Sequence, residues 1–310
     1  MVSSRSLLFL LGSAVLYILF QIANKAAIKL GADALALTAI GLLVNALTLL
    51  VIVVWKKRKI PALGKIPGAT DLVIVGISSS FLAQLFLVTG IGMTSVTNAN
   101  LILIMNGVFT ALFSRSVNSE KLSRGFWKVV AVMLIGAALV TTHGQLAPPG
   151  IGDALIFLAA LSFGVGNTYA KKAMRAGHQA DFVTLARFAV GFAAIALPAL
   201  IFGKPAELAS SPGLLFLAIA GGVLFAVNVY LFYLAVEAEG AAIAAQVTLV
   251  IPLFAVAADY LFFSRLPDAA QIVGGGIILA GAYAFVRMKG AGNLVPAEER
   301  KKKAERDEKR

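Results

Sequence analysis

The amino-acid sequence predicts an all-α membrane protein in which ten transmembrane helices form two inverted repeats of five helices. Three observations lead to this prediction. The 310 residues are 59% hydrophobic and only 14% charged, so the chain is far more apolar than an average soluble domain. The apolar residues form about ten stretches of roughly 20 residues, the length that a helix needs to cross a hydrocarbon core of about 30 Å. The two halves of the chain also align with each other.

Charged or Pro- and Gly-rich breaks separate the expected spans. None of the apolar stretches alternates as the strands of a membrane barrel do, so we expect helices. The first stretch is too long for the core of a signal peptide and no small-residue cleavage site follows it, so we expect it to be a retained span. The spans are expected near residues 7–28, 35–55, 72–93, 97–116, 126–142, 153–173, 182–202, 214–236, 241–263 and 269–287.

Basic residues predict the orientation, because short cytoplasmic loops carry the excess of Lys and Arg. The side of the N-terminus has fifteen before the tail: Arg5, Lys56, Lys57, Arg58, Lys59, Lys65, Arg115, Lys121, Arg124, Lys128, Lys171, Lys172, Arg175, Arg287 and Lys289. The opposite side has four: Lys25, Lys29, Lys204 and Arg265. We therefore expect a multi-pass protein of a bacterial or archaeal plasma membrane, with both termini in the cytoplasm.

Several classes of protein are disfavoured. The net charge of +12 lies in loops and the tail rather than on one folded face, so no nucleic-acid partner is expected. There is no cysteine, and His143 and His178 fall in loops on opposite sides of the bilayer, so they cannot share a metal ion. No phosphate-binding loop or metalloprotease motif is present, and we expect neither a cofactor nor an enzyme.

An internal repeat divides the chain. With a shift of 145 or 146 residues, Lys25, Lys29 and Gly31 align with Lys171, Arg175 and Gly177, Gln21 with Asn167, Gly76 with Gly221, and Gly136 with Gly281. Five spans per half is an odd number, so the second half enters the membrane from the other side. Inverted repeats are typical of transporters that work by alternating access. We expect repeats at residues 1–145 and 146–290, followed by a disordered, charged cytoplasmic tail at 291–310.

Particular motifs resemble a known family. The second half contains Pro252-Leu-Phe, Gln271-Ile-Val-Gly274 and Gly281, and the first half contains Glu120-Lys-Leu-Ser-Arg-Gly followed by Leu134-Ile-Gly136-Ala. Over about residues 6–288 this pattern is similar to the EamA-type drug/metabolite transporter superfamily. The resemblance implies a secondary transporter that exports amino acids, other metabolites or drugs. An exchanger of nucleotide sugars or sugar phosphates, or a membrane channel, is the alternative.

The chain departs from the family pattern at four places. Arg265 replaces an acidic residue, Gly107 replaces a proline, and Tyr17-Ile18 and Phe163-Gly164 stand where Trp-Gly is usual. A substrate is therefore not carried over from the family.

Uncharged polar residues near the middle of the spans are the candidate solute ligands. Amide groups both donate and accept, so they suit a neutral or zwitterionic solute, but they also serve as interhelical hydrogen bonds worth about 1 kcal/mol or less. A phosphate dianion would need several cations, which this set does not contain. The set comprises Tyr17, Gln21, Gln84, Asn106, Asn167, Asn228 and Tyr230.

Two charged residues inside predicted spans are candidates for gating or coupling. Arg187 either snorkels toward the cytoplasm or pairs with Asp181, or it binds an anion or gates the pathway. Asp259 lies one turn from the outer end of the ninth span. It is either capped by a neighbouring donor or takes up a proton as the coupling ion.

Overall fold

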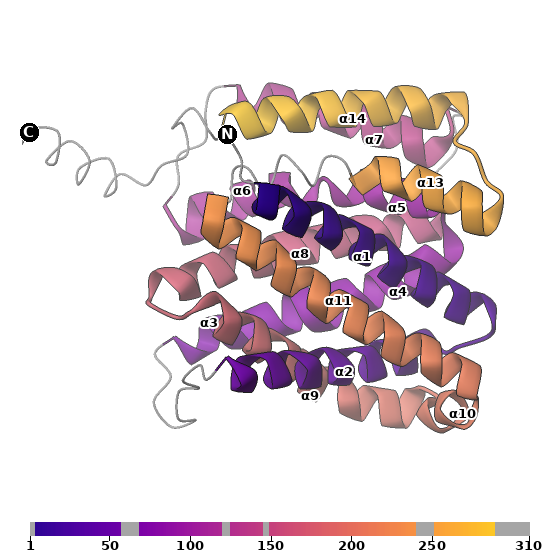
Figure 1. The fold of residues 1–310 in the computed structure, drawn as a ribbon. Coiled ribbons are helices and arrows are strands. Elements are labelled where there is room, and N and C mark those ends of the chain that lie inside the picture. The colour runs from indigo at the N-terminus through magenta and orange to yellow at the C-terminus, as the bar shows by residue number, and fades with distance from the viewer. Residues whose placement is uncertain (1–3, 57–67, 120–124, 145–148, 240–250, 289–310) are drawn as a thin grey trace, which may run out of the picture.

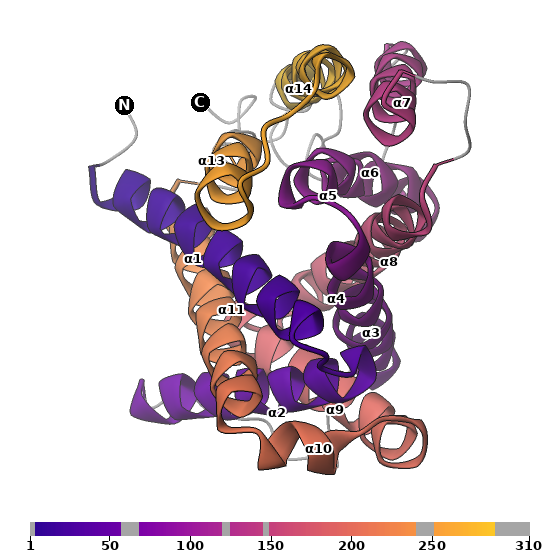
Figure 2. The same cartoon turned by 90° about the vertical axis from the view of Figure 1, so that its right-hand side faces the viewer.

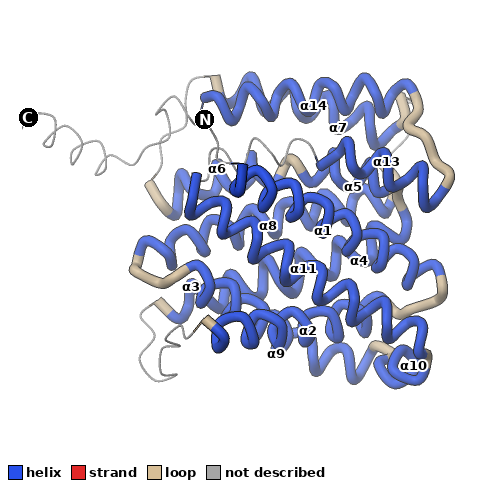
Figure 3. Tube along the Cα trace, viewed as in Figure 1, coloured by secondary structure: helices blue, strands red, loops and turns tan. Residues whose placement is uncertain are grey.

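The computed structural model describes residues 4–56, 68–119, 125–144, 149–239 and 251–288, and the regular elements in these ranges are helices (Figures 1 and 3). In chain order they are α1 (Ser4–Lys29), α2 (Ala34–Trp55), α3 (Ala69–Val75), the π-helix η1 (Gly76–Leu82), α4 (Ala83–Met93), α5 (Val96–Leu103), α6 (Asn106–Val117), α7 (Phe126–Thr142), α8 (Ile151–Arg175), α9 (Ala180–Phe202), α10 (Pro205–Ser210), α11 (Pro212–Glu239), α13 (Ile251–Phe263) and α14 (Ala269–Met288).

These helices confirm the predicted all-α membrane fold. Seven helical segments of the described chain are long and apolar enough to cross a membrane. The apolar helices in α7, α13 and α14 are shorter. Two spans are composite, because α3, η1 and α4 run on as one segment, as do α5 and α6. The helix ends lie within three residues of the expected positions, except that residues 241–250 of the ninth span are outside the described residues. The expected tail at 291–310 also lies outside them.

The spans lie side by side with alternating direction. Figure 1 shows the start of α1 and the end of α14 at the same end of the bundle. We call the opposite end the distal end. It holds the α1–α2, α4–α5 and α13–α14 connections, which face the viewer in Figure 2.

Helix pairing follows the internal repeat. The main neighbours are α1 with α11, α4 with α8, α2 with α9, and α7 with α14. Exchanging the two halves turns the first pair into the second and leaves the other two pairs unchanged. This pattern is what two halves related by a two-fold axis require.

Aligned glycines end α1 and α8 in the same way. Gly31 and Gly177 have positive φ angles of 92° and 99°, which glycine adopts at little cost. The next amide in each case bonds back into the helix, from Ala32 to the Ala27 carbonyl and from His178 to the Ala173 carbonyl. Aligned positions of the two halves therefore share one local structure.

Glycines also bring α7 and α14 together. A Cβ atom on Gly136 would lie 2.7 Å from the carbonyl oxygen of Gly274, and one on Gly281 would lie 2.5 Å from Cγ of Met133. The two backbones approach closely because these residues have no side chain.

Candidate functional site

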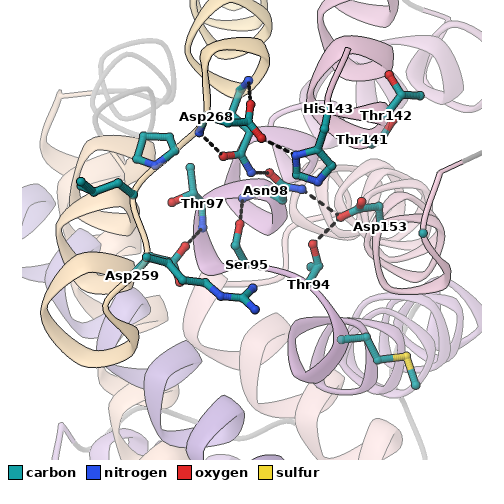
Figure 4. A pocket seen from close by; sticks show the side chains of 16 residues that line it. Thr94, Ser95, Thr97, Asn98, Thr141, Thr142, His143, Asp153, Asp259 and Asp268 are labelled. Atoms are coloured by element: carbon teal, nitrogen blue, oxygen red, sulfur yellow. Dashed lines mark hydrogen bonds and ion pairs between the residues drawn. The ribbon is translucent and has the colours of Figure 1, made fainter. Parts of the chain in front are cut away.

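A polar pocket of about 600 Å³ lies at the distal end, where segments of both halves meet (Figure 4). The first half contributes the α4–α5 junction and the end of α7, and the second half contributes the start of α8 and the α13–α14 connection. The lining residues are Met93, Thr94, Ser95, Thr97, Asn98, Thr141, Thr142, His143, Gly150, Asp153, Asp259, Arg265, Leu266, Pro267, Asp268 and Gln271.

Asp153 is a buried carboxylate on the wall of this pocket. It lies in the first turn of α8, where the positive helix terminus favours an acid, and its side chain is 5% exposed. Its Oδ1 accepts hydrogen bonds from the hydroxyl of Thr94 and, at 3.4 Å, from the amide of Asn98. No Lys, Arg or His of the described ranges forms an ion pair with it. A buried carboxylate beside a cavity can therefore accept a cationic group of a ligand.

Asp268 is held in place at the start of α14. Its Oδ1 accepts the amide of Gln271, and its own amide donates to the Gln271 side chain, both at 2.8 Å, which forms a capping box. Its other oxygen contacts His143 Nδ1. Desolvation acts to raise the pKa of Asp268, but the bonds from Gln271 and His143 outweigh it, so the pKa lies below its usual value.

Gln271 connects this cap to Asp153. Its side-chain amide donates to Asn98 Oδ1 at 2.6 Å, and Asn98 in turn donates to Asp153. The Asn98 backbone amide is bound by Ser95, the N-cap of α5. These contacts, drawn in Figure 4, orient the Asn98 side chain toward Asp153.

Asp259 closes another side of the pocket. Its oxygens accept the Val96 amide at 3.1 Å and the Thr97 amide at 2.6 Å, which are the first amides of α5. Lys25 Nζ lies 3.7 Å from Asp259 Oδ1, and each of the two side chains is 2% exposed. In this structure Asp259 is therefore capped by neighbouring donors, which is one of the two alternatives for this residue.

Lys25 belongs to a polar stripe on α1. Ser13, Tyr17, Gln21, Lys25 and Lys29 follow at intervals of four residues, so they share one face of the helix. The prediction that Lys25 is a loop charge is wrong, because it lies inside α1 and is buried. The four-residue spacing within an apolar helix was the signal for its role, and Asn98, Asn100 and Asp153 had no comparable signal.

Comparison with known proteins identifies the family. The model of the EamA-like transporter family matches residues 4–142 and again residues 150–287. The chain belongs to the EamA-like transporter family. The expected resemblance is thus confirmed, and with it a multi-pass membrane transporter of small-molecule solutes that is built from two repeats.

Structural similarity extends over nearly the whole EamA-like chain. Solved structures include 26 matching chains. One crystal structure has a TM-score of 0.58 and 16% sequence identity, and the match covers 90% of this chain and 96% of the other. At this identity the likeness shows the fold alone. No curated protein matches the sequence.

The predicted ligands of this EamA-like protein do not converge on the pocket, as none of the seven lines it. Gln21 exchanges two hydrogen bonds with Asn100, at 3.1 and 2.8 Å. Asn228 donates to the backbone and side chain of Ser13, at 2.7 and 2.9 Å. These two amides hold helices together. Counting along a helix places both residues in the interior of their spans but does not give the direction in which each side chain points.

The other predicted ligands are spread over the bundle. Tyr17 packs against Phe20 and Phe225, and the ring of Tyr230 lies 4.6 Å from Lys56 Nζ. Gln84 is 3% exposed, and no described group bonds its Nε2. Asn106 begins α6 and Asn167 lies on α8, both half-buried.

Arg187 is a buried arginine of α9, with 6% of its surface exposed. Snorkelling or pairing with Asp181, and the alternative of anion binding or gating, stay predictions. It donates to Ser80 Oγ at 3.2 Å and to the Ser79 carbonyl at 3.4 Å, both in the π-helix η1. The guanidinium therefore links α9 to η1.

Proposed function

We propose that this EamA-like transporter exports a small zwitterionic or neutral polar solute, such as an amino acid, by alternating access. One observation supports this proposal most strongly: the pocket between the two repeats carries one carboxylate and one guanidinium that have no ion-pair partner in the described chain. These groups belong to Asp153 and Arg265.

The other charges of the pocket are already compensated. Asp259 is paired with Lys25 and Asp268 with His143. A ligand ammonium is therefore expected to bind Asp153, and a ligand carboxylate to bind Arg265, through charge-assisted hydrogen bonds. A volume of about 600 Å³ is within the usual range for small-molecule sites.

The same charges disfavour a phosphate. A dianion needs more than one cation to replace its hydration, but the pocket has a single arginine and three aspartates. The exchanger of nucleotide sugars or sugar phosphates is the weaker alternative for this reason.

The direction of transport comes from the family resemblance, and the charge distribution supplies only the orientation of the pocket. With both termini in the cytoplasm, the distal end faces the outside, and the pocket is open to it. In export, release of the solute from this pocket to the outside is the last step.

Thermal stabilisation of the purified protein tests the proposed solute. Anything that binds the folded state alone raises the melting temperature by mass action. Among L-amino acids, nucleosides and sugar phosphates, at least one amino acid is expected to stabilise the wild type, and Asp153→Asn is expected to abolish its effect. Glu207→Gln, an exposed acid outside the pocket, is the matched control and should leave the effect unchanged. Stabilisation by sugar phosphates alone would contradict the proposal.

A further inference from the structure

One buried ion pair holds the junction between α4 and α5 from both sides. Lys25 Nζ donates to the carbonyl of Thr94, the C-cap of α4, at 2.7 Å. Asp259 accepts the first two amides of α5, and the two charges lie 3.7 Å apart. Because Lys25 belongs to the first repeat and Asp259 to the second, this pair ties the two repeats together at the junction.

The same junction forms a wall of the pocket. The Thr94 hydroxyl and the Asn98 amide both bind Asp153, while the Thr94 carbonyl binds Lys25. A single residue therefore contacts both the ion pair and the carboxylate proposed to bind solute. A movement of this junction changes the ion pair and the pocket together.

We propose that Lys25 and Asp259 form a proton-operated latch that holds the pocket in its outward-open shape. The proposal rests on the proposed function, which assigns the distal pocket to the outside. With both groups charged, their attraction and the positive terminus of α5 keep the junction fixed. A proton on Asp259 cancels its charge, so the attraction to Lys25 is lost and α5 loses its anionic cap.

The position of the pair defines the path of the proton. Asp259 lines the pocket and Lys25 does not, so a proton from outside reaches the carboxylate first. It binds an oxygen of Asp259 while Lys25 stays an ammonium. When the transporter turns inward, the proton leaves to the cytoplasm and the carboxylate is restored. One proton thus moves inward for each outward step of the solute.

Charged groups of both signs surround Asp259. Neither α4 nor α5 has a charged side chain. The facing groups are Lys25 and Lys29 on α1, Arg265 after α13, Asp153 on α8, His143 after α7 and Asp268 before α14.

Cysteine labelling of the intact protein tests the latch without a solute. The natural chain has no cysteine, so a single one can be introduced without other changes. Thr142→Cys reports on the pocket, and Leu30→Cys, on a side chain 68% exposed at the distal end, corrects for the pH dependence of the reagent. The measurement is the ratio of their labelling rates in proteoliposomes with a membrane-impermeant thiol reagent, over a range of external pH.

In the wild type this ratio is expected to fall at least about threefold between about pH 7 and about pH 3.5, as protonated latches open and the pocket closes. Asp259→Asn should give the low ratio at every pH. The double variant Lys25→Met/Asp259→Asn leaves no unpaired buried charge, so it can be used if the single variant does not fold. Its labelling ratio should also be insensitive to pH. Asp71→Asn removes the acid of another interhelical ion pair, with Lys172, and should keep the wild-type response.

A wild-type labelling ratio that does not change with pH would overturn the latch. A wild-type pH response in both Asp259 variants would also overturn it, as would loss of the pH response in Asp71→Asn. Because the labelling needs no solute, this outcome is separate from the proposed function. Solute flux with labelling insensitive to pH would refute the latch alone, whereas a pH-dependent ratio without any flux would refute the proposed solute.

Discussion

At the scale of the residue, Thr94 uses its two polar groups in different directions. Its carbonyl accepts from Lys25 and its hydroxyl donates to Asp153. The chemistry of the distal end therefore depends on an uncharged residue that joins two helices. Two buried carboxylates lie close to it, and they differ in their partners, since Asp259 has a lysine while Asp153 has only neutral donors.

The two asparagines of α5, Asn98 and Asn100, have different partners, so their removal should have different effects. Asn98→Ala should raise KM for a zwitterion by about tenfold, because it removes a donor that orients Asp153 in the pocket. Asn100→Ala should leave KM unchanged and lower the melting temperature, because Asn100 bonds the buried Gln21 and does not line the pocket. Transport kinetics and thermal unfolding of both variants check this. Equal effects on KM would contradict the assignment of the pocket.

The sequence places Gln21 and Asn228 inside apolar helices but does not predict their partners. A polar residue in an apolar helix must bond to something, and the sequence does not say whether that is a solute or the next helix. The structure shows the next helix in both cases. The pocket residues Asp153 and Asn98 lie near helix ends, where polar residues are common and carry little information.

At the scale of the element, the spans were predicted well, because length and apolarity alone define a membrane helix. The π-helix η1 was not predicted. Its contacts with the buried guanidinium of Arg187 come from α9 and are therefore distant in the sequence. The packing of α7 on α14 was predictable from Gly274 and Gly281, since a seven-residue interval places both on one face.

Two glycines of α14 provide a test of this packing. In Gly274→Ala a Cβ atom would lie 2.7 Å from the Gly136 carbonyl oxygen, so the helices must separate, and we expect a loss of about 1–3 kcal/mol. Gly276→Ala on the same helix meets nothing within 4 Å and should stabilise the helix by up to about 1 kcal/mol. Melting temperatures in detergent compare the two. A Gly274→Ala protein as stable as Gly276→Ala would show that the helices are not in close contact.

At the scale of the whole molecule, the two repeats make alternating access mechanically simple. Helices pair across the repeats in a pattern that is preserved when the halves are exchanged, so two related shapes can be reached by exchanging their conformations. The pocket and the ion pair of Lys25 with Asp259 both lie where the repeats meet at the distal end. The count of basic loop residues predicts that this end faces outward.

Counterflow in proteoliposomes tests most directly the central claim that the pocket is a carrier site reached in turn from each side. Vesicles loaded with the amino acid that stabilises the protein are diluted into a trace of the same labelled amino acid. A carrier site should give a transient accumulation of label that saturates with concentration, is absent from empty vesicles and is lost in Asp153→Asn. Uptake that rises linearly with concentration and does not respond to internal solute would indicate a channel and contradict the account.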